Sequence, residues 1–302
     1  MRILLTGGSS FTGCWFAREL ARAGHEVTAT LRSASYDGVR AERVAELARH
    51  CETVDGLSFG DDRFVQLVRG GGWDLLCVHG AQVEGYRSPG FDVAAALAAN
   101  TRRAADVVSH VPRVLVTGSV FEPGAGRSDD GALPAFSPYG LSKAFTAEVF
   151  RYHCARNGIG FGRFVIPNPF GPMEEPRFTR SLVRAWRSGE TPQVRTPGYV
   201  RDNIPVSLLA LAYVRFAEEM PASGGEVSTG PSGYCETQGA FAERFAREIG
   251  GRLGIAAPLE LVAQEDWSEP AMRVNTDRAN GPSLGWSEPA AWDELAAWYG
   301  QS

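Results

Sequence analysis

Short apolar runs alternate with helical patterns along the first half of the chain. An apolar run at residues 3–5 leads into a glycine-rich turn, after which Phe16 and Leu20 recur at helical spacing until Gly24. A second strand pattern covers residues 27–31. A strand, a turn, a helix and another strand in this order predict a βαβ unit, which is the building block of a parallel sheet.

The same alternation continues as far as residue 121 and predicts the elements of one sheet. Helical patterns cover 39–49, 62–69 and the alanine-rich segment 91–110, and strand patterns cover 52–54, 73–81 and 113–121. The longer strand patterns are nearly continuous apolar runs, which is typical of strands buried on both faces. We therefore expect an α/β fold with a doubly wound, Rossmann-type parallel sheet.

The pattern changes after residue 160, where frequent prolines divide the chain into shorter pieces. Helical patterns return at 177–188, 207–220 and 238–249. We expect a dinucleotide-binding lobe over residues 1–165 and a smaller, mixed α/β lobe over 166–302 that mainly binds substrate. Parts of about 199–220 are expected to pack back on the first lobe.

Composition narrows the class of protein. The 302 residues are 44% hydrophobic and 22% charged, with a net charge of -5, which is ordinary for a globular protein and predicts no nucleic-acid partner. The five cysteines contain no Cys-x-x-Cys pair, so we expect no disulfide framework and no metal site, and a cytoplasmic protein with reduced thiols. No signal-peptide pattern is found and no apolar run reaches about 18 residues, so no membrane partner is expected.

The first turn, "TGGSSFTG" at residues 6–13, has the position of a dinucleotide-binding turn. A helix N-terminus follows it, where backbone N–H groups and the helix dipole favour a pyrophosphate. Ser10 stands where such turns carry their middle glycine, and its Cβ limits close approach although its hydroxyl can itself donate to phosphate. From these residues alone, two interpretations remain: a cofactor-binding turn and a purely structural turn.

The end of the second strand bears on the choice of cofactor. An acidic residue there binds the ribose 2′-hydroxyl of NAD, but this chain has Arg32 and Ser33. These side chains suit a 2′-phosphate, so NADP(H) is favoured and NAD(H) remains possible. The alternative is a solvated surface arginine without a ligand.

The segment "SPYGLSK" places Tyr139 and Lys143 four residues apart, on one face of a predicted helix. A free phenol titrates near about 10, and a neighbouring ammonium together with an oxidised nicotinamide favours the phenolate. Tyr139 is then able to exchange a proton at neutral pH. The alternative is an ordinary tyrosine and lysine on an amphipathic helix.

With these pieces in view, the chain resembles the extended short-chain dehydrogenases/reductases over nearly its full length. This is the family of NAD(P)-dependent nucleotide-sugar epimerases, dehydratases and reductases. The matching pieces, in chain order, are "TGGSSFTG", "HGA" at 79–81, Asn100, "VTGS" ending at 119, "YGLSK" at 139–143, "NPFGP" at 168–172, "YVRDNIPVS" at 199–207 and "LGW" at 284–286.

The resemblance implies a set of catalytic roles. Tyr139 would be the acid/base, and Lys143 would hold the nicotinamide ribose and lower the pKa of Tyr139. Ser119 would be the hydroxyl that polarises the sugar carbonyl or alcohol. Thr117, two residues earlier on the same strand face, is the alternative to Ser119, because counting back from Val120 selects it.

The resemblance also implies binding residues for cofactor and substrate. Asn168 would reach the substrate diphosphate or the nicotinamide side, and Arg201 would bind a substrate phosphate through its bidentate fork. The expected cofactor residues are Gly7, Ser9, Ser10, Phe11, Gly13, Arg32, Ser33, Ser58, Phe59, Gly80, Ala81, Gln82, Asn100, Thr117, Tyr139, Lys143 and Pro167. The expected substrate residues are Glu84, Tyr86, Asn168, Arg177, Arg201 and Arg273.

Three departures from the family pattern shape the functional hypotheses. Ser10 replaces the middle glycine, Ser58 and Phe59 replace an Asp-hydrophobic pair beside adenine, and "TGSVFE" lacks the Asp-Glu of family dehydratases. A dehydratase is therefore least expected. Arg32 favours a 4-ketoreductase, which transfers hydride at C4 of an NDP-hexose, over a 4-epimerase with tightly bound NAD.

Two further expectations complete the picture. A hypothesis of another class is a non-catalytic NADP-binding sensor that has kept only the fold. The resemblance also implies a homodimer formed through the alanine-rich helix 91–110 and the helix beginning at Tyr139.

Overall fold

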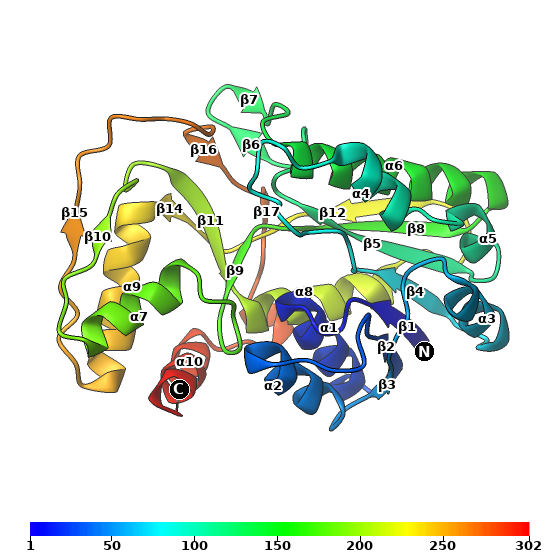
Figure 1. Ribbon diagram of the computed structural model, residues 1–302, viewed down its shortest axis with the longest axis horizontal. Coiled ribbons are helices and arrows are strands. Elements are labelled where there is room, and N and C mark those ends of the chain that lie inside the picture. The colour runs from blue at the N-terminus through cyan, green and yellow to red at the C-terminus, as the bar shows by residue number, and fades with distance from the viewer. Residues whose placement is uncertain (302) are drawn as a thin grey trace.

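A seven-stranded parallel sheet with helices on both faces forms the main body of the protein, in a computed structural model that describes residues 1–301 (Figure 1). Its strand order is β12-β8-β5-β4-β1-β2-β3, and all six pairings are parallel, which confirms the doubly wound α/β fold. The strands are β1 (Arg2–Thr6), β2 (Glu26–Thr30), β3 (Glu52–Val54), β4 (Leu75–Val78), β5 (Arg113–Ser119), β8 (Gly160–Ile166) and β12 (Glu226–Thr229).

Each face of the sheet has its own apolar core. Leu5, Cys77 and Leu115 belong to the core under α1 (Phe11–Arg22), α2 (Gly38–Leu47) and α8 (Val206–Glu219). Leu76 and Val114 face the opposite core, because successive side chains of a strand point to opposite faces. The helices on that second face are α3 (Asp62–Gly70), α4 (Val93–Asn100), α5 (Ala104–Val108) and α6 (Pro138–Asn157).

The second lobe is built on a small mixed sheet with an aromatic core. Phe170, Phe245 and Trp292 pack together there between the sheet and its helices. The strands are β9 (Asn168–Phe170), β11 (Val200–Pro205), β14 (Tyr234–Thr237) and β16 (Met272–Arg273), and the helices are α7 (Phe178–Arg187), α9 (Gln238–Leu253) and α10 (Glu288–Gln301). The shorter elements are β6 (Arg127–Ser128), β7 (Gly131–Ala132), β10 (Gln193–Val194), β13 (Pro231–Ser232), β15 (Glu260–Leu261), β17 (Asp277–Arg278) and the 3-10 helix η1 (Pro282–Leu284).

Three elements differ from the sequence-based expectation. The helix expected over 91–110 is two helices, since Arg103 adopts a left-handed φ of 54° between α4 and α5. The helix α10 had not been predicted from the apolar pattern. The edge strand β12 belongs to the large sheet although it lies beyond 199–220, and the division of the chain near residue 165 stays a prediction.

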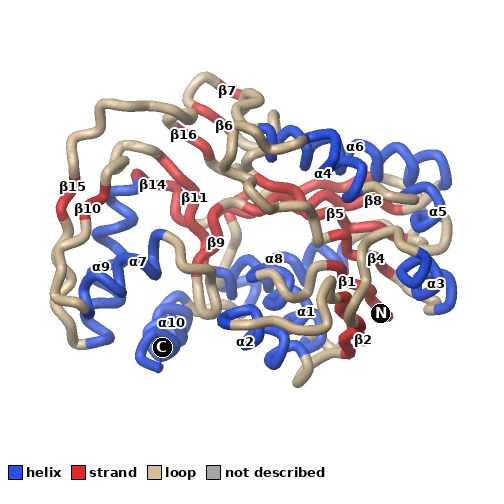
Figure 2. The backbone as a smooth tube through the Cα atoms, viewed as in Figure 1, coloured by secondary structure: helices blue, strands red, loops and turns tan. Residues whose placement is uncertain are grey.

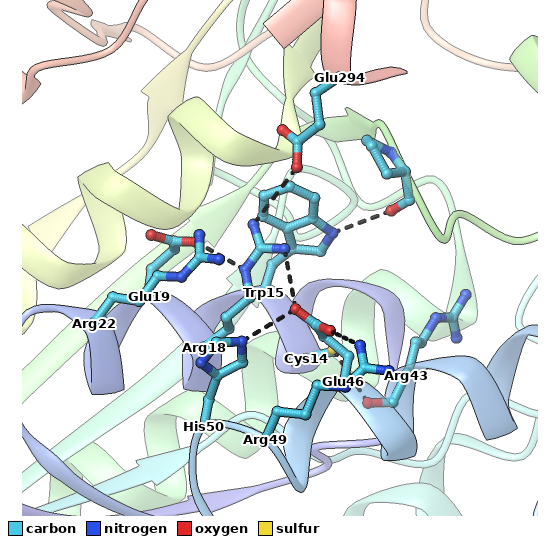
Figure 3. A network of polar contacts seen from close by, with 11 residues as sticks. Cys14, Trp15, Arg18, Glu19, Arg22, Arg43, Glu46, Arg49, His50 and Glu294 are labelled. Carbon is cyan, nitrogen blue, oxygen red and sulfur yellow. Dashed lines mark hydrogen bonds and ion pairs between the residues drawn. The ribbon is translucent and has the colours of Figure 1, made fainter. Parts of the chain in front are cut away.

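Buried arginines join the two lobes. Arg43 of α2 is completely buried and donates to the carbonyl of Met173 from Nε at 2.9 Å and from Nη2 at 2.6 Å, and to the carbonyl of Ser9 at 3.3 Å. Trp15 donates to the carbonyl of Pro172 at 3.1 Å, and the guanidinium of Arg18 lies over the Trp15 ring at 3.7 Å (Figure 3). The loop that carries residues 171–175 is thereby held against the glycine-rich turn.

Neither a membrane-spanning helix nor a metal site is found within residues 1–301. None of the helices within residues 1–301 combines the length and the apolar character needed to cross a membrane. Over the same residues, no group of His, Cys, Asp or Glu side chains is arranged to hold a metal ion, and all five cysteines are unpaired.

Glu174 is a buried carboxyl between the loop after β9 and the C-terminal helix. It accepts from the hydroxyls of Thr179, at 2.5 Å, and of Tyr299. Burial raises its pKa from 4.5 to about 7, against the lowering effect of these hydrogen bonds. The folded protein binds this proton more tightly than the unfolded chain does. The protonated carboxyl therefore adds to the free energy of unfolding; this stabilisation is fully present below pH 4.5 and is lost as pH rises through 7.

We therefore predict that Glu174→Gln flattens the pH dependence of stability. The wild-type protein should lose about 2 kcal/mol more than the variant between pH 5 and pH 7, as judged from urea unfolding at both values. Glu190→Gln, at an exposed position in the loop after α7, is the control. Equal slopes for wild type and Glu174→Gln would contradict the assignment.

Candidate active site

The candidate site lies at the carboxyl edge of the large sheet, where two backbone segments meet. Gly7 has a φ of 77°, and a Cβ on it would lie 2.7 Å from the Cα of Gly80. The hydroxyl of Thr6 accepts hydrogen bonds from the N–H groups of His79, at 3.0 Å, and of Gly80, at 2.9 Å. The first turn and the end of β4 therefore touch, and only glycine fits at residue 7.

Ser10 is the N-cap of α1, and its side chain points inward. Its Oγ accepts from the N–H of Gly13 at 3.1 Å and lies 2.8 Å from the carbonyl oxygen of Gly7 and 2.9 Å from Nε2 of His79. The hydroxyl is thus occupied within the protein. Capping uses a lone pair of this oxygen, and the one hydroxyl hydrogen has an acceptor in the carbonyl of Gly7, so the expected donation to phosphate gains no support here and stays a prediction.

The turn nevertheless fits a dinucleotide. Within residues 1–301, the N–H groups of Phe11 and Thr12 have no hydrogen-bond partner, and they stand in the first turn of α1. A Cβ on Gly13 would lie 2.3 Å from the carbonyl oxygen of Gly7, so the turn is close-packed. Free backbone donors at a helix N-terminus are suited to a pyrophosphate, which the backbone would therefore bind.

His79 connects this turn to β5. Its Nε2 lies 3.2 Å from the hydroxyl of Thr12 in addition to the Ser10 contact, and its Nδ1 lies 3.1 Å from the hydroxyl of Thr117. Burial, together with the charge of Lys143, lowers the pKa of His79 to about 3, so the ring is neutral. The sequence analysis assigned no role to His79, although the motif "HGA" contains it.

The two candidate hydroxyls of β5 have different surroundings. Thr117 is almost fully buried and is engaged by His79. Ser119 ends the strand, and its Oγ accepts from the N–H of Phe121 at 3.2 Å. No acceptor for the Ser119 hydroxyl hydrogen is found in the described chain, so this hydroxyl is able to donate to a ligand.

Tyr139 and Lys143 lie in the first two turns of α6, which begins with a regular cap. The Oγ of Ser137 accepts from the N–H of Gly140 at 3.0 Å, and a proline occupies the first helical position. Lys143 is only 5% exposed, and its ammonium has neither a hydrogen bond nor an ion pair with any residue in 1–301. A buried charge without a partner is unfavourable, so this ammonium is suited to bind a ligand such as a ribose hydroxyl.

The half-buried Tyr139 is enclosed by aromatic rings from three segments. The ring centroid of Tyr86 lies 5.4 Å away and those of Phe91 and Phe121 each lie 6.0 Å away. Burial, followed by the charge of Glu122, raises the pKa of Tyr139 above its ordinary value. The expected lowering by Lys143 is therefore not found in the protein alone.

Two arginines with different surroundings lie beyond Tyr139. The guanidinium of Arg273 stands 3.9 Å over the Phe121 ring, and its Nε and Nη1 have no partner in the described residues. Burial, followed by the charge of Arg201, lowers the pKa of Arg273 to about 10. Arg201 donates to three carbonyl groups, and Glu269 accepts from Arg201 at 3.1 Å and from Arg273 at 3.4 Å.

The long connection from β15 to β16 runs as loop in Figure 2; Arg201 contacts its last residues, Glu269 and Pro270, and Arg273 lies in β16, where the connection ends. Because Arg273 keeps free donors, it is better placed than Arg201 to take up an anionic group. Arg177, at the start of α7, is exposed, and its guanidinium lies 5.9 Å from the Tyr86 ring. The structure therefore brings Tyr86, Tyr139, Arg177 and Arg273 into one cluster.

Several expected cofactor residues serve other contacts. Asn100 accepts from the N–H of Gln82 at 2.8 Å and donates to Thr146 at 3.3 Å, so it positions the loop after β4. The Phe59 ring packs against Phe64, at 4.9 Å between centroids, and the N–H of Ser58 is taken by Asp61. The Phe59 ring is thus engaged in packing, whereas the side chain of Ser58 is exposed, and both stay predicted adenine contacts.

The remaining expected residues line the edges of the site. Arg32 and Ser33 are exposed at the end of β2, and the backbone of Ser9 is held by Arg43. Glu84 borders a groove of about 480 Å³ that the loop after β4 forms with the start of α4. Half-buried Ala81 lies in that loop, and Pro167 and Asn168 join β8 to β9, where Asn168 pairs with Asn203.

A family model for the NAD dependent epimerase/dehydratase family matches residues 3–226. No curated protein matches the chain in sequence. One similar solved structure is UDP-glucuronic acid 4-epimerase from Bacillus cereus with UDP-glucuronic acid and NAD, at 15% identity and a TM-score of 0.74, covering 100% of this chain and 99% of that chain. A second is UDP-glucose 4-epimerase from Thermotoga maritima with UDP-glucose, at 17% identity and a TM-score of 0.75, with coverages of 100% and 99%. A third is UDP-N-acetylglucosamine 4-epimerase from Methanobrevibacter ruminantium M1 with UDP-N-acetylmuramic acid, at 17% identity and a TM-score of 0.73, with coverages of 99% and 98%. At these identities the likeness shows a shared fold.

The inward contacts of Ser10 lead to a prediction about stability. Ser10→Ala removes the cap of α1 and a contact to His79, so the free energy of unfolding should fall by about 1–2 kcal/mol in urea titrations. Ser35→Ala, in the exposed loop after β2, serves as the control. A loss no greater than that of the control would mean that the Ser10 hydroxyl does not hold the turn.

Proposed function

Because the chain belongs to the NAD dependent epimerase/dehydratase family, we propose that it is a nucleotide-sugar 4-epimerase that works with a nicotinamide cofactor. The three similar structures named above are all 4-epimerases of nucleotide sugars, one of them with NAD bound, and they support this hypothesis over the 4-ketoreductase expected from Arg32. The reductase remains the second candidate, because Arg32 is exposed at the end of β2.

One observation carries the proposal. Lys143 is 5% exposed, and within residues 1–301 no group pairs with its ammonium, which lies one helical turn from Tyr139 on the same edge of the sheet as the unpartnered N–H groups of Phe11 and Thr12. A purely structural helix gains nothing from an unpaired buried cation. A site that receives a dinucleotide at the turn and its ribose at the lysine accounts for all three groups.

The residues present allow the chemistry of such an enzyme. A bound nicotinamide would supply a hydride acceptor and donor at the sugar carbon. Tyr139 would take the proton from the sugar hydroxyl and return it, while Ser119 donates a hydrogen bond to the same oxygen. Lys143 would orient the ribose and add positive charge beside the phenol, whose pKa is otherwise raised by burial and Glu122. Arg273 would bind the diphosphate, and the rings of Tyr86, Phe91 and Phe121 would exclude water.

The direct test offers the purified protein a series of UDP-hexoses with NAD and follows the products by NMR. An epimerase converts the sugar into its C4 epimer without net consumption of the cofactor. Stoichiometric oxidation of NADPH by an NDP-4-keto-sugar would instead assign the reductase. Absence of both reactions, with cofactor bound, would favour the non-catalytic sensor.

Tyr139→Phe removes one hydroxyl and keeps the packing of the ring. The rate should fall by about 10²–10⁴, the usual contribution of general acid–base catalysis, while the cofactor Kd changes only a few-fold. Tyr152→Phe, an exposed tyrosine on the same helix, is the matched control and should leave the rate unchanged. Near-full activity in Tyr139→Phe would remove the acid/base role.

Arg32 supports the second candidate, the reductase, because its exposed side chain suits the 2′-phosphate of NADP(H). A charge-assisted contact to a 2′-phosphate is worth about 1.5–3 kcal/mol, which is one to two decades in affinity. Arg32→Ala should therefore weaken NADP(H) by that factor and NAD(H) little, as measured by calorimetry, with the exposed Arg49→Ala as control. Tighter binding of NAD(H) than NADP(H) to the wild-type protein would contradict the preference for NADP(H).

We propose a homodimer through α4 and α6. The exposed side of α4 carries the small residues Ala94, Ala95, Ala98 and Ala99, and the neighbouring α6 exposes Phe145 (45%) and Tyr152 (54%). Small residues allow the close approach of helices, and the exposed rings would be covered in a dimer. Light scattering should give a dimer mass that Phe145→Glu reduces to a monomer; a monomeric wild type at micromolar concentration would reject the proposal.

The unpaired thiols bear on the compartment. All five cysteines are free, and Cys14, Cys77 and Cys154 are buried. Free cysteines are usual where thiols are kept reduced, and we therefore propose the cytoplasm.

A further inference from the structure

Glu122 is a fully buried carboxylate three residues after Ser119. Its Oε1 accepts from the N–H of Ser119 at 2.7 Å, and its Oε2 forms an ion pair with Arg163 of β8. The Arg163 side chain is 23% exposed, whereas that of Glu122 is fully buried. A buried carboxylate is costly unless it is paired and hydrogen-bonded, and Glu122 meets both conditions.

The same carboxylate holds the turn that follows β5. The N–H of Glu122 donates to the carbonyl of Ser119 at 2.9 Å, and a Cβ on Gly118 would lie 3.0 Å from Glu122 Oε1. The turn therefore folds back tightly on the end of the strand. Phe121 lies in this turn, and its ring contacts both Tyr139 and Arg273.

Charges from several elements surround the phenol of Tyr139. Glu122 raises its pKa in addition to burial, Tyr86 from the loop after β4 acts in the same direction, and Arg177 from the start of α7 lowers it. The pKa of Lys143 is lowered by burial; Glu122 opposes that shift and Arg163 adds to it. The guanidinium of Arg273 lies over the Phe121 ring. Glu122 thus acts on both members of the Tyr139 and Lys143 pair.

We propose that Glu122 and Arg163 form a positioning pair that holds Ser119 and the Phe121 turn against Tyr139 and places its charges beside this phenol. Neither residue is a catalytic residue, because their partners are protein groups. The inference rests on the acid/base role proposed for Tyr139, but it concerns the charge beside this phenol and is measurable without turnover.

The two members of the pair allow a test with opposite signs. Glu122→Gln keeps an acceptor for the Ser119 N–H and removes a negative charge. In the pH profile of kcat, the limb that reports the titration of Tyr139 should therefore move to lower pH by roughly one unit. Arg163→Met leaves Glu122 without its counter-charge, so the limb should move up instead. The double variant should return it close to the wild-type position.

A merely structural ion pair predicts a different outcome. Both single variants break the same contact, so they would lower the rate together and leave the limb where it is, which would overturn the proposal. Glu148→Gln removes a carboxylate from an exposed ion pair on α6 and is the matched control, with no shift expected.

A second readout separates this proposal from the proposed function. With ¹³Cζ-labelled tyrosine, the resonance that is missing in Tyr139→Phe identifies Tyr139, and its titration should begin at lower pH in Glu122→Gln and at higher pH in Arg163→Met. These shifts support the pair even if no nucleotide sugar is turned over, whereas an unmoved resonance in both variants overturns it.

A second variant covers the case in which Glu122→Gln fails to fold. Glu122→Asp keeps the charge but shortens its reach to Ser119. Its kcat should fall while the limb of the pH profile stays in place, and full kcat would contradict the positioning role.

Discussion

The contact between Gly7 and Gly80 is the constraint on which the site depends. It brings the first turn, the end of β4 and, through His79, the end of β5 to one point of the sheet edge. A side chain at Gly7 would separate these segments. Because they are held together, the N-terminus of α1 opens toward the same space as Ser119 and the first turns of α6. Ser10 fits into this arrangement because His79 and the first turn of the helix take up its hydroxyl.

The buried charges of the protein fall into two groups. Arg43 and Glu122 have their hydrogen-bonding groups taken up by protein partners, and they hold loops in place. Lys143 has no partner among residues 1–301, and Arg273 keeps two unpartnered N–H groups there although it is almost completely buried. Unsatisfied buried cations are unfavourable in the free protein. They are therefore suited to mark where the ribose and the phosphates of ligands would bind, at the two ends of the cluster around Tyr139.

The strength of the local signal decided what the sequence could predict. The large sheet was predictable because its strands are apolar runs separated by regular helices, and α6 because "SPYGLSK" combines a cap, a proline and a helical spacing. The break at Arg103 was not, since the alanine-rich segment has the pattern of one helix and nothing in that pattern marks residue 103 as left-handed. The roles of His79, Glu122 and Arg163 depend on strands meeting side by side, which no local pattern records. The contact of the Ser10 hydroxyl with His79 was not predictable for the same reason, because His79 follows a different strand.

The central claim is that a hydride leaves and returns to the same sugar carbon while Tyr139 moves the proton. A nucleotide sugar carrying deuterium at C4 tests it most directly, by NMR and mass spectrometry of the epimer formed in ordinary water. The account predicts that the product keeps its deuterium at C4. Loss of the deuterium to solvent would contradict the account, because it would show that the carbon is deprotonated rather than oxidised and reduced.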